Sequence, residues 1–287
     1  MILSRRGRRF WKEWQPWLHL PLLLFAFLFL IPILWMLSTS LKAPDDIVRD
    51  LASVHWMPHP ATVANFQDVL GKVEEFPVWR WTGNSLFISL TTTALVLIVD
   101  SLAAFAYARL KWKGRDIIFA VLLATMLVPG QALLIPTYLL VRSLGWFDTY
   151  AALIVPAGAG TFGVFLLRQF FQAIPQELEE AARIDGCTSL GILRHVVLPL
   201  SLPALAALSI FTFIATWNAF EGPLLFTDSM EMRTLPIGIA IFQGRYSTEY
   251  GPMMAAATLA AVPVIIAFLL FQRHIIKGIS LTGMAGR

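Results

Sequence analysis

Six long apolar stretches constrain the fold of this chain more than any other feature of its sequence. A helix that crosses the hydrocarbon core of a bilayer needs roughly 20 mostly apolar residues. The composition agrees with such helices, since 57% of the 287 residues are hydrophobic and only 14% are charged, whereas soluble domains carry about 25% charged residues. We therefore predict an all-α integral membrane protein with spans at about 17–38, 84–106, 117–138, 150–171, 199–220 and 252–271.

The basic residues are distributed unevenly between the segments that join these stretches. If the N-terminus is cytoplasmic, fifteen of the 22 Lys and Arg residues fall on the cytoplasmic side of the membrane, as the positive-inside rule requires. This asymmetry predicts six transmembrane helices with both termini in the cytoplasm. The predicted parts are a cytoplasmic segment at 1–16 and a six-helix domain at 17–287, with an outer loop at 39–83 and a cytoplasmic loop at 172–198.

Proline and glycine occur inside several predicted spans, at positions where they would break a helix. In lipid, the freed backbone groups need partners in neighbouring helices or in water that lines a cavity. Ordinary kinked packing explains any single break, whereas several together favour a bundle that moves or encloses a path. The residues concerned are Pro129-Gly130 in the third span, Pro156, Gly158 and Gly160 in the fourth, and Pro263 in the sixth.

The charged run "IPQELEEAARIDG" between the fourth and fifth spans predicts a short helix outside the membrane. Pro175 suits the first position of a helix, and the glutamates that follow place negative charge near the positive end of the helix dipole. Gly186 can adopt the left-handed conformation that ends a helix. The sequence therefore predicts a helix of about three turns from Pro175 to Asp185. Thr188 or Ser189 can cap the next helix.

One face of this predicted helix carries small and polar side chains at helical spacing. Leu178, Ala181, Ala182 and Asp185 follow the i, i+3, i+4, i+7 pattern. Small alanines allow close approach to a partner surface, and the carboxylates at the edge can pair with Arg or Lys. The alternative is a connecting helix on the membrane surface, but such a helix would carry more basic residues.

The run "EAARIDG", followed after eleven residues by "LP", resembles the signature cytoplasmic loop of ABC importer permeases. More specifically, the chain resembles the sugar-permease family typified by the smaller maltose-transporter permease. The similar segments are "AYARLKWKGRD", "TWNAFEGPLLF" and the tail "FQRHIIKGISLTGMAG", which departs from the usual family ending. The resemblance implies the type I ABC importer permease fold in a bacterial or archaeal inner membrane. It also implies ATP-driven import of an oligosaccharide, sugar or polyol by alternating access.

This resemblance makes the helix at 175–186 a coupling helix that docks on a separate ATPase. The implied partners are a second homologous permease in a heterodimer, two ABC ATPase subunits, an extracellular solute-binding protein and membrane lipid, without nucleic acid. ATP and magnesium would bind the ATPase, since no GxxxxGK[ST] motif in this chain could hold nucleotide phosphates. The implied coupling residues are Glu179, Glu180, Ala181, Ala182, Asp185 and Gly186.

Polar and aromatic residues near the outer end of the fifth span are candidates for the substrate path. An aromatic face beside an amide, as at Trp217 and Asn218, suits a sugar ligand. Trp is also common at membrane interfaces, and Ser or Thr often forms hydrogen bonds between helices, so a structural role stays open. The candidates are Trp217, Asn218, Thr216, Thr212 and Glu221.

Asp100 is the one carboxylate well inside a predicted span. An intramembrane acid suggests an alternative function as a proton-coupled secondary transporter. However, pairing with the nearby basic residues Arg109, Lys111 or Lys113 is the favoured interpretation. An intramembrane enzyme is a further alternative, but the sequence offers no nucleophile–base pair. The single cysteine, Cys187, has no neighbours at metal-ligand spacing, so we expect neither catalysis nor a metal.

Overall fold

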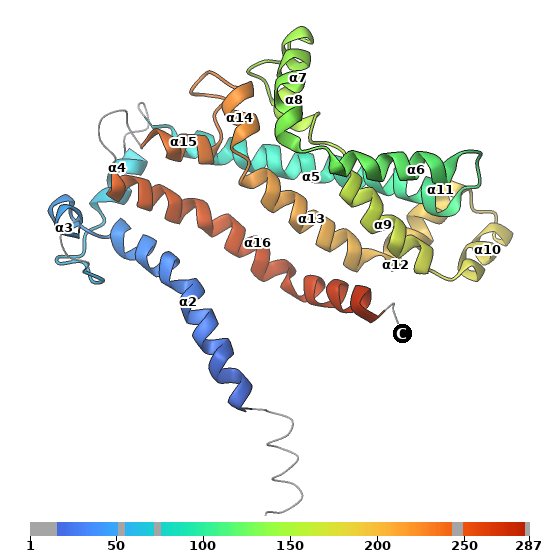
Figure 1. Cartoon of the computed structure of the whole chain (residues 1–287), viewed down its shortest axis with the longest axis horizontal. Coiled ribbons are helices and arrows are strands. Elements are labelled where there is room, and N and C mark those ends of the chain that lie inside the picture. The colour runs from blue at the N-terminus through green and yellow to red at the C-terminus, as the bar shows by residue number, and fades with distance from the viewer. Residues whose placement is uncertain (1–15, 51–54, 72–75, 243–248, 285–287) are drawn as a thin grey trace, which may run out of the picture. The chain divides into compact units, whose positions relative to one another are not determined.

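The structure is a computed structural model that describes residues 16–50, 55–71, 76–242 and 249–284. The regular elements within these ranges are helices, in agreement with the all-α prediction (Figure 1). The chain divides into two compact units, Met1–Gly71 with Phe242–Leu259 and Lys72–Ile241 with Ala260–Arg287. Of the predicted cytoplasmic segment 1–16, all but Pro16 lies outside the described residues.

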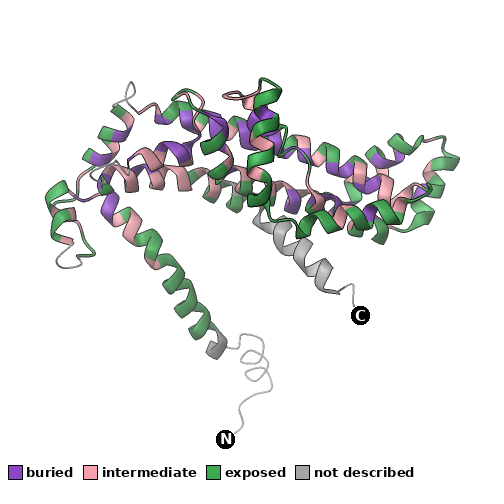
Figure 2. Cartoon of the chain, turned by 45° about the horizontal axis from the view of Figure 1, so that its top comes forward, coloured by how far each residue is buried: buried purple, intermediate pink, exposed green. Residues whose placement is uncertain are grey.

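The first unit contains the apolar helix α2 (Pro16–Ser40), two short helices and the start of α16 (Tyr250–Met284). The described side chains of α2 are exposed along most of the helix, which is green in Figure 2. A helix that is apolar on all faces requires an apolar environment around it, so α2 fits the first predicted span. The two short helices are α3 (Pro44–Asp50) and α4 (Ala64–Gly71).

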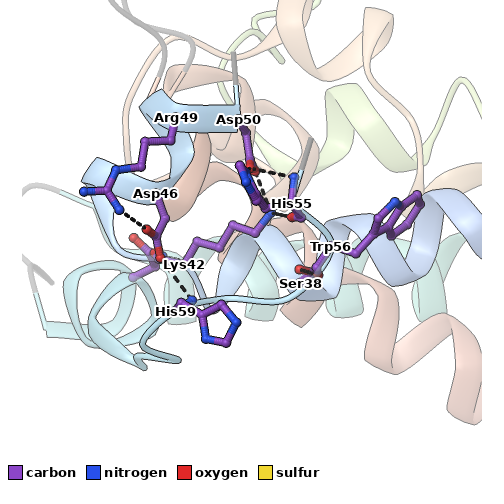
Figure 3. Close-up of polar contacts among 9 residues, drawn as sticks. Ser38, Lys42, Asp46, Arg49, Asp50, His55, Trp56 and His59 are labelled. Atoms are coloured by element: carbon purple, nitrogen blue, oxygen red, sulfur yellow. Dashed lines mark hydrogen bonds and ion pairs between the residues drawn. The ribbon is translucent and has the colours of Figure 1, made fainter. Parts of the chain in front are cut away.

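A buried lysine organises the described residues between 41 and 71, which we call the cap (Figure 3). Lys42 is fully buried, and its Nζ lies 2.5 Å from Oδ2 of Asp50 and also donates to the His55 carbonyl. Asn65 is also buried and donates to the Lys42 carbonyl at 2.8 Å. The predicted outer loop therefore contains a folded part, in which buried charged and polar groups make the contacts described.

The second unit is built around α5 (Val78–Arg109), which packs against α9 (Thr161–Ala173) and α13 (Leu202–Trp217) (Figure 1). A cluster of buried apolar side chains joins these helices and includes Leu167 and Leu208. Other helices of the second unit are α6 (Arg115–Ala124), the 3₁₀ helix η1 (Thr125–Leu127), α7 (Gly130–Ser143), α8 (Tyr150–Ile154), α10 (Gln176–Ile184), α11 (Ser189–Ile192), the π-helix η2 (Leu193–Val197), α12 (Leu198–Leu200), α14 (Glu221–Phe226) and α15 (Leu235–Ile241).

Two of the described helices are long and apolar enough to cross a membrane, His19–Ser40 within α2 and the whole of α5. Helix α16 contains a shorter apolar stretch, Tyr250–Ile266. The number of spans rises to four if two bent pairs each form one span: Arg115–Leu127 with Gly130–Ser143, bent by 100°, and Ser189–Leu200 with Leu202–Trp217, bent by 81°. The count of six spans and the cytoplasmic location of both termini stay predictions.

The predicted helix breaks are confirmed in two spans and wrong in one. Pro129 precedes α7 at the 100° bend, and Pro156 lies in the irregular segment between α8 and α9. Pro263, by contrast, lies inside α16, and the helix continues through it, since long apolar helices tolerate the loss of one backbone hydrogen bond. The bend at Ser201 was not predicted, although Pro203 in the first turn of α13 is a typical signal for a helix start.

Gly238 provides a test of the packing in the second unit. Trp81 is fully buried, and its Nε1 donates to the Met230 carbonyl at 2.9 Å, so its ring cannot turn away freely. A Cβ at Gly238 would lie 2.0 Å from this ring. We therefore expect Gly238→Ala to lower the free energy of unfolding by about 1–3 kcal/mol, the usual cost of overpacking. Thermal unfolding of the detergent-solubilised protein measures the loss.

Gly83→Ala is the matched control, because Gly83 is exposed in α5 and no atom lies within 4 Å of an added Cβ. There alanine should raise stability by about 0.5–1 kcal/mol, since glycine costs conformational entropy within a helix. Equal thermal unfolding midpoints for Gly238→Ala and Gly83→Ala would contradict the tight contact between Gly238 and Trp81.

Candidate functional site

Helix α10 covers Gln176–Ile184 and agrees with the predicted short helix to within one residue at each end. Pro175 directly precedes it, and Gly186 follows it with a φ of +84°, the left-handed conformation that ends helices. The hydroxyl of Thr188 accepts a hydrogen bond from the Gly191 amide at 3.2 Å, which caps the next helix. Local signals in the sequence therefore determine where this loop is helical and where it turns.

A buried ion pair fixes α10 to the end of α5. Arg109 is the last residue of α5, and its Nε lies 2.7 Å from Oε1 of Glu179. The two side chains are only 4% and 6% exposed. The guanidinium also donates to the carbonyls of Phe171 and Ile174, at the end of α9. Because an unpaired buried charge costs several kcal/mol, this pair strongly favours one orientation of α10 about its axis.

The opposite face of α10 is exposed. Ile184 is 87% exposed and Leu178 is 45% exposed, which is unusual for large apolar side chains on a polar loop. Ala182 instead packs against the apolar core of the second unit. Of the other predicted coupling residues, Glu179 is buried in the ion pair, and the exposed ones are Glu180, Ala181, Asp185 and Gly186.

The structure places the predicted path residues of α13 largely in contacts within the protein. Trp217 is 2% exposed, stacks on Phe213 and donates through Nε1 to the Ala260 carbonyl at 3.2 Å. The hydroxyl of Thr216 donates to the carbonyl of Thr212. Asn218 and Glu221 are exposed, although the Asn218 amide donates to the Ile214 carbonyl of the same helix. The candidates that keep exposed polar groups are therefore Asn218 and Glu221.

A cavity of about 770 Å³ lies beside α5, the segment around η2 and α13. Its wall is mostly leucine, and its few polar side chains are Ser101, Arg194 and Ser209. Ser209 donates to the Leu205 carbonyl of its own helix at 2.7 Å. Within the described ranges, no group of three or more His, Cys, Asp or Glu side chains could hold a metal ion.

Asp100 pairs with a backbone amide rather than with the basic residues that we expected. It is fully buried, and Oδ1 accepts a hydrogen bond from the amide of Gly160 at 3.1 Å, at the start of α9. Oδ2 lies close to Gly163, where an added Cβ would approach it to 2.0 Å. The predicted pairing with Arg109, Lys111 or Lys113 is therefore wrong, and the partner is the amino end of a helix.

Residues 100–281 match the family model of the binding-protein-dependent transport system inner membrane component. This match covers more than half of the chain and includes the ion pair and the whole of α10. The chain belongs to this family. It is a permease of the inner membrane, a transport component rather than an enzyme, as the sequence predicted.

Curated relatives extend the similarity over nearly the whole permease. An arabinooligosaccharide transport system permease of Halalkalibacterium halodurans is 34% identical over 261 residues, which cover 91% of this chain and 93% of the relative. A trehalose/maltose transport system permease of Thermococcus litoralis is also 34% identical, over 92% of this chain and 94% of the relative. The similarity therefore extends over about nine tenths or more of this chain and of both relatives.

Solved structures agree with this fold. A chain of a bacterial ABC transporter that imports the acidic polysaccharide alginate matches the permease with a TM-score of 0.81 at 23% identity. The match covers 96% of the permease and 99% of that chain. A chain of the methionine ABC transporter in its inward-facing conformation matches with a TM-score of 0.53 at 21% identity, over 70% of the permease. The permease therefore has the fold of an ABC importer membrane subunit.

Proposed function

We propose that this permease is the membrane-spanning subunit of an ATP-driven importer that moves a carbohydrate inward by alternating access. The substrate class is supported by relatives that are named for arabinooligosaccharides and for trehalose or maltose. In this proposal six helices cross the membrane and both termini are cytoplasmic. A second homologous permease, two ATPase subunits and an extracellular solute-binding protein complete the complex, and ATP and magnesium bind to the ATPases.

The observation that carries this proposal is the division of α10 into a fixed face and an exposed face. Arg109 fixes the helix through Glu179, while Ile184, Glu180 and Ala181 remain accessible on the other side. The exposed face combines Ile184 with Ala181, Glu180 and Arg183, which suits a partner cleft that is apolar within and charged at its rim. Closure of the ATPase dimer on nucleotide would move α10 and, with it, the helices to which it is attached.

The proton-coupled alternative receives less support from the surroundings of Asp100. A proton relay needs a carboxylate that exchanges protons with water or with another titratable group. The side chain of Asp100 is fully buried, with one oxygen bonded to the Gly160 amide and the other against Gly163. A role in fixing helix positions accounts for these contacts without a proton path.

The test of the proposed function is capture of an ATPase on the purified permease. Wild-type protein should retain an ATPase subunit that carries a Walker motif, whereas Ile184→Glu should reduce its recovery about tenfold by placing a charge in an apolar contact. Val48→Glu is the matched control, because Val48 is a 65% exposed apolar residue on α3. If wild-type permease retains no ATPase, or if both variants lose it equally, the proposal for α10 is wrong.

A further inference from the structure

Helix α9 is attached to α5 at its amino end by a carboxylate. Oδ1 of Asp100 accepts the amide hydrogen of Gly160, the residue that precedes the first turn of α9. Asp100 is fully buried, and Gly163 lies against its second oxygen. Negative charge is stabilised at the amino end of a helix because the unpaired amides there carry partial positive charge. The contact is therefore favourable electrostatically as well as geometrically.

The same helix is attached to α5 at its carboxyl end by a guanidinium. Arg109 donates to the carbonyl of Phe171, in the last turn of α9, and to that of Ile174, the residue that follows the helix. Positive charge is stabilised there by the opposite end of the helix dipole. The 13-residue helix α9 is thus held at both ends, by side chains of opposite charge from α5.

Arg109 also spans the connection between α9 and α10. Only Ile174 and Pro175 separate the two helices, and both have extended backbone, so this connection could act as a hinge. Arg109 donates to the Phe171 carbonyl of α9 and to the Ile174 carbonyl of the connection, and it pairs with Glu179 of α10. One terminal nitrogen of the guanidinium donates to both carbonyls, whereas Nε lies beside the carboxylate as an ion pair without hydrogen-bond geometry. Bending at this connection would therefore break a buried ion pair.

We propose that Asp100 and Arg109 are positioning residues that join α5, α9 and α10 into one rigid arm. This inference rests on the proposed function, because the arm would carry the movement of α10 to the middle of the membrane. The packing between its two ends is continuous, since Ala104 and Val164 belong to the same buried apolar cluster. Movement imposed on Ile184 would then reach Gly160 without being absorbed at the junction of α9 and α10.

The first experiment measures substrate transported per ATP hydrolysed by the complete complex in proteoliposomes. Arg109→Gln and Glu179→Gln should each lower this ratio about tenfold, while ATP hydrolysis by the assembled complex continues. Arg109→Lys should give a ratio between those of wild type and Arg109→Gln. Lysine keeps the positive charge but lacks the planar guanidinium that reaches both carbonyls. Lys113→Gln is the matched control, since it removes an exposed charge four residues further on and should leave the ratio unchanged.

The second experiment measures the distance between α5 and α10 directly. Spin labels on Leu90→Cys, an exposed site on α5, and on Glu177→Cys of α10 report the geometry of the arm in a Cys187→Ser background. A rigid arm gives the same distance distribution without nucleotide and with ATP trapped, and Arg109→Gln broadens that distribution. A wild-type shift larger than one helical turn, about 5 Å, would overturn the rigid arm.

These outcomes separate the arm from the proposed function. A complex that couples ATP hydrolysis to uptake while the distance between the labels shifts would disprove the arm and leave the proposed function intact. A permease that binds no ATPase but keeps a fixed distance between the labels would disprove the coupling role and leave the contacts of Arg109 intact. Equal loss of ATP hydrolysis and of uptake in Arg109→Gln, without recovery in Arg109→Lys, would also contradict the positioning role.

Discussion

Replacing Gly163 with alanine is expected to lower the free energy of unfolding of the permease by about 3 kcal/mol, at the upper end of overpacking costs. The added Cβ would lie 2.0 Å from Oδ2 of Asp100 and 3.1 Å from Cδ1 of Leu208. Asp100 has a short side chain, and its other oxygen is bonded to the Gly160 amide. Relief of the clash therefore requires breaking that hydrogen bond or separating α9 from α5.

A double-mutant cycle makes this result specific to the carboxylate. Asp100→Ala removes the atoms that would clash, so Asp100→Ala with Gly163→Ala should cost less than the sum of the single variants. Thermal unfolding measures the stability of the four purified proteins: wild type, the two single variants and the double variant. Gly130→Ala is the control, because no atom lies within 4 Å of a Cβ added there. Additive losses in the cycle would mean that Gly163 and Asp100 are not in contact.

Replacing Asp50 with asparagine is expected to destabilise the cap by about 3–5 kcal/mol, the cost of breaking one buried ion pair. The side chain of Lys42 is 1% exposed, so its ammonium would lie buried without the opposite charge of Asp50, beside the neutral His55 carbonyl and the Trp35 ring. Hydrogen–deuterium exchange over residues 55–71 measures the effect. Asp45→Asn changes an exposed carboxylate on the same helix and should leave exchange unaltered.

The contribution of Asp50 should also depend on pH. Burial raises the pKa of its carboxyl, but hydrogen bonds from Lys42 and from the His55 amide, together with their charges, outweigh burial and leave the pKa below its usual value. A lowered pKa gives stability that is complete above the unfolded value of about 3.9 and is lost as the pH falls through the folded value. In the wild-type protein, protection of the cap from hydrogen–deuterium exchange should therefore fall in acid. In Asp50→Asn this protection should change little over the same pH range. Parallel pH profiles would contradict the ion pair.

The sequence predicts the limits of the short helix α10 better than the course of the long apolar helices. Pro175 and Gly186 act through their own backbone conformations, so the limits of α10 follow from local chemistry. The effect of a proline inside an apolar stretch depends instead on the helices around it. Pro129 lies at a bend of 100°, whereas Pro263 lies within a continuous helix, although both occur in similar apolar surroundings.

The limits of α10 were predicted, but its internal contacts were not. The resemblance implies a coupling role for Glu179 and Glu180 alike, without distinguishing the two. Their roles differ because Arg109 precedes Glu179 by 70 residues and meets it only in the folded protein. Asp100 was expected to pair with basic side chains for a related reason. A sequence shows which side chains are charged, but not which backbone amides, such as that of Gly160, will lie beside a carboxylate.

The single buried carboxylate of α10 makes this loop sensitive to changes in its length. One residue inserted between Pro175 and Glu179 would turn the rest of the helix by about 100° and bring Leu178 against the guanidinium of Arg109. One residue deleted there would bring Glu180 to the same place, which preserves a carboxylate for Arg109 but redirects Ile184. Evolution can therefore change the composition of the exposed face more freely than the number of residues that precede it.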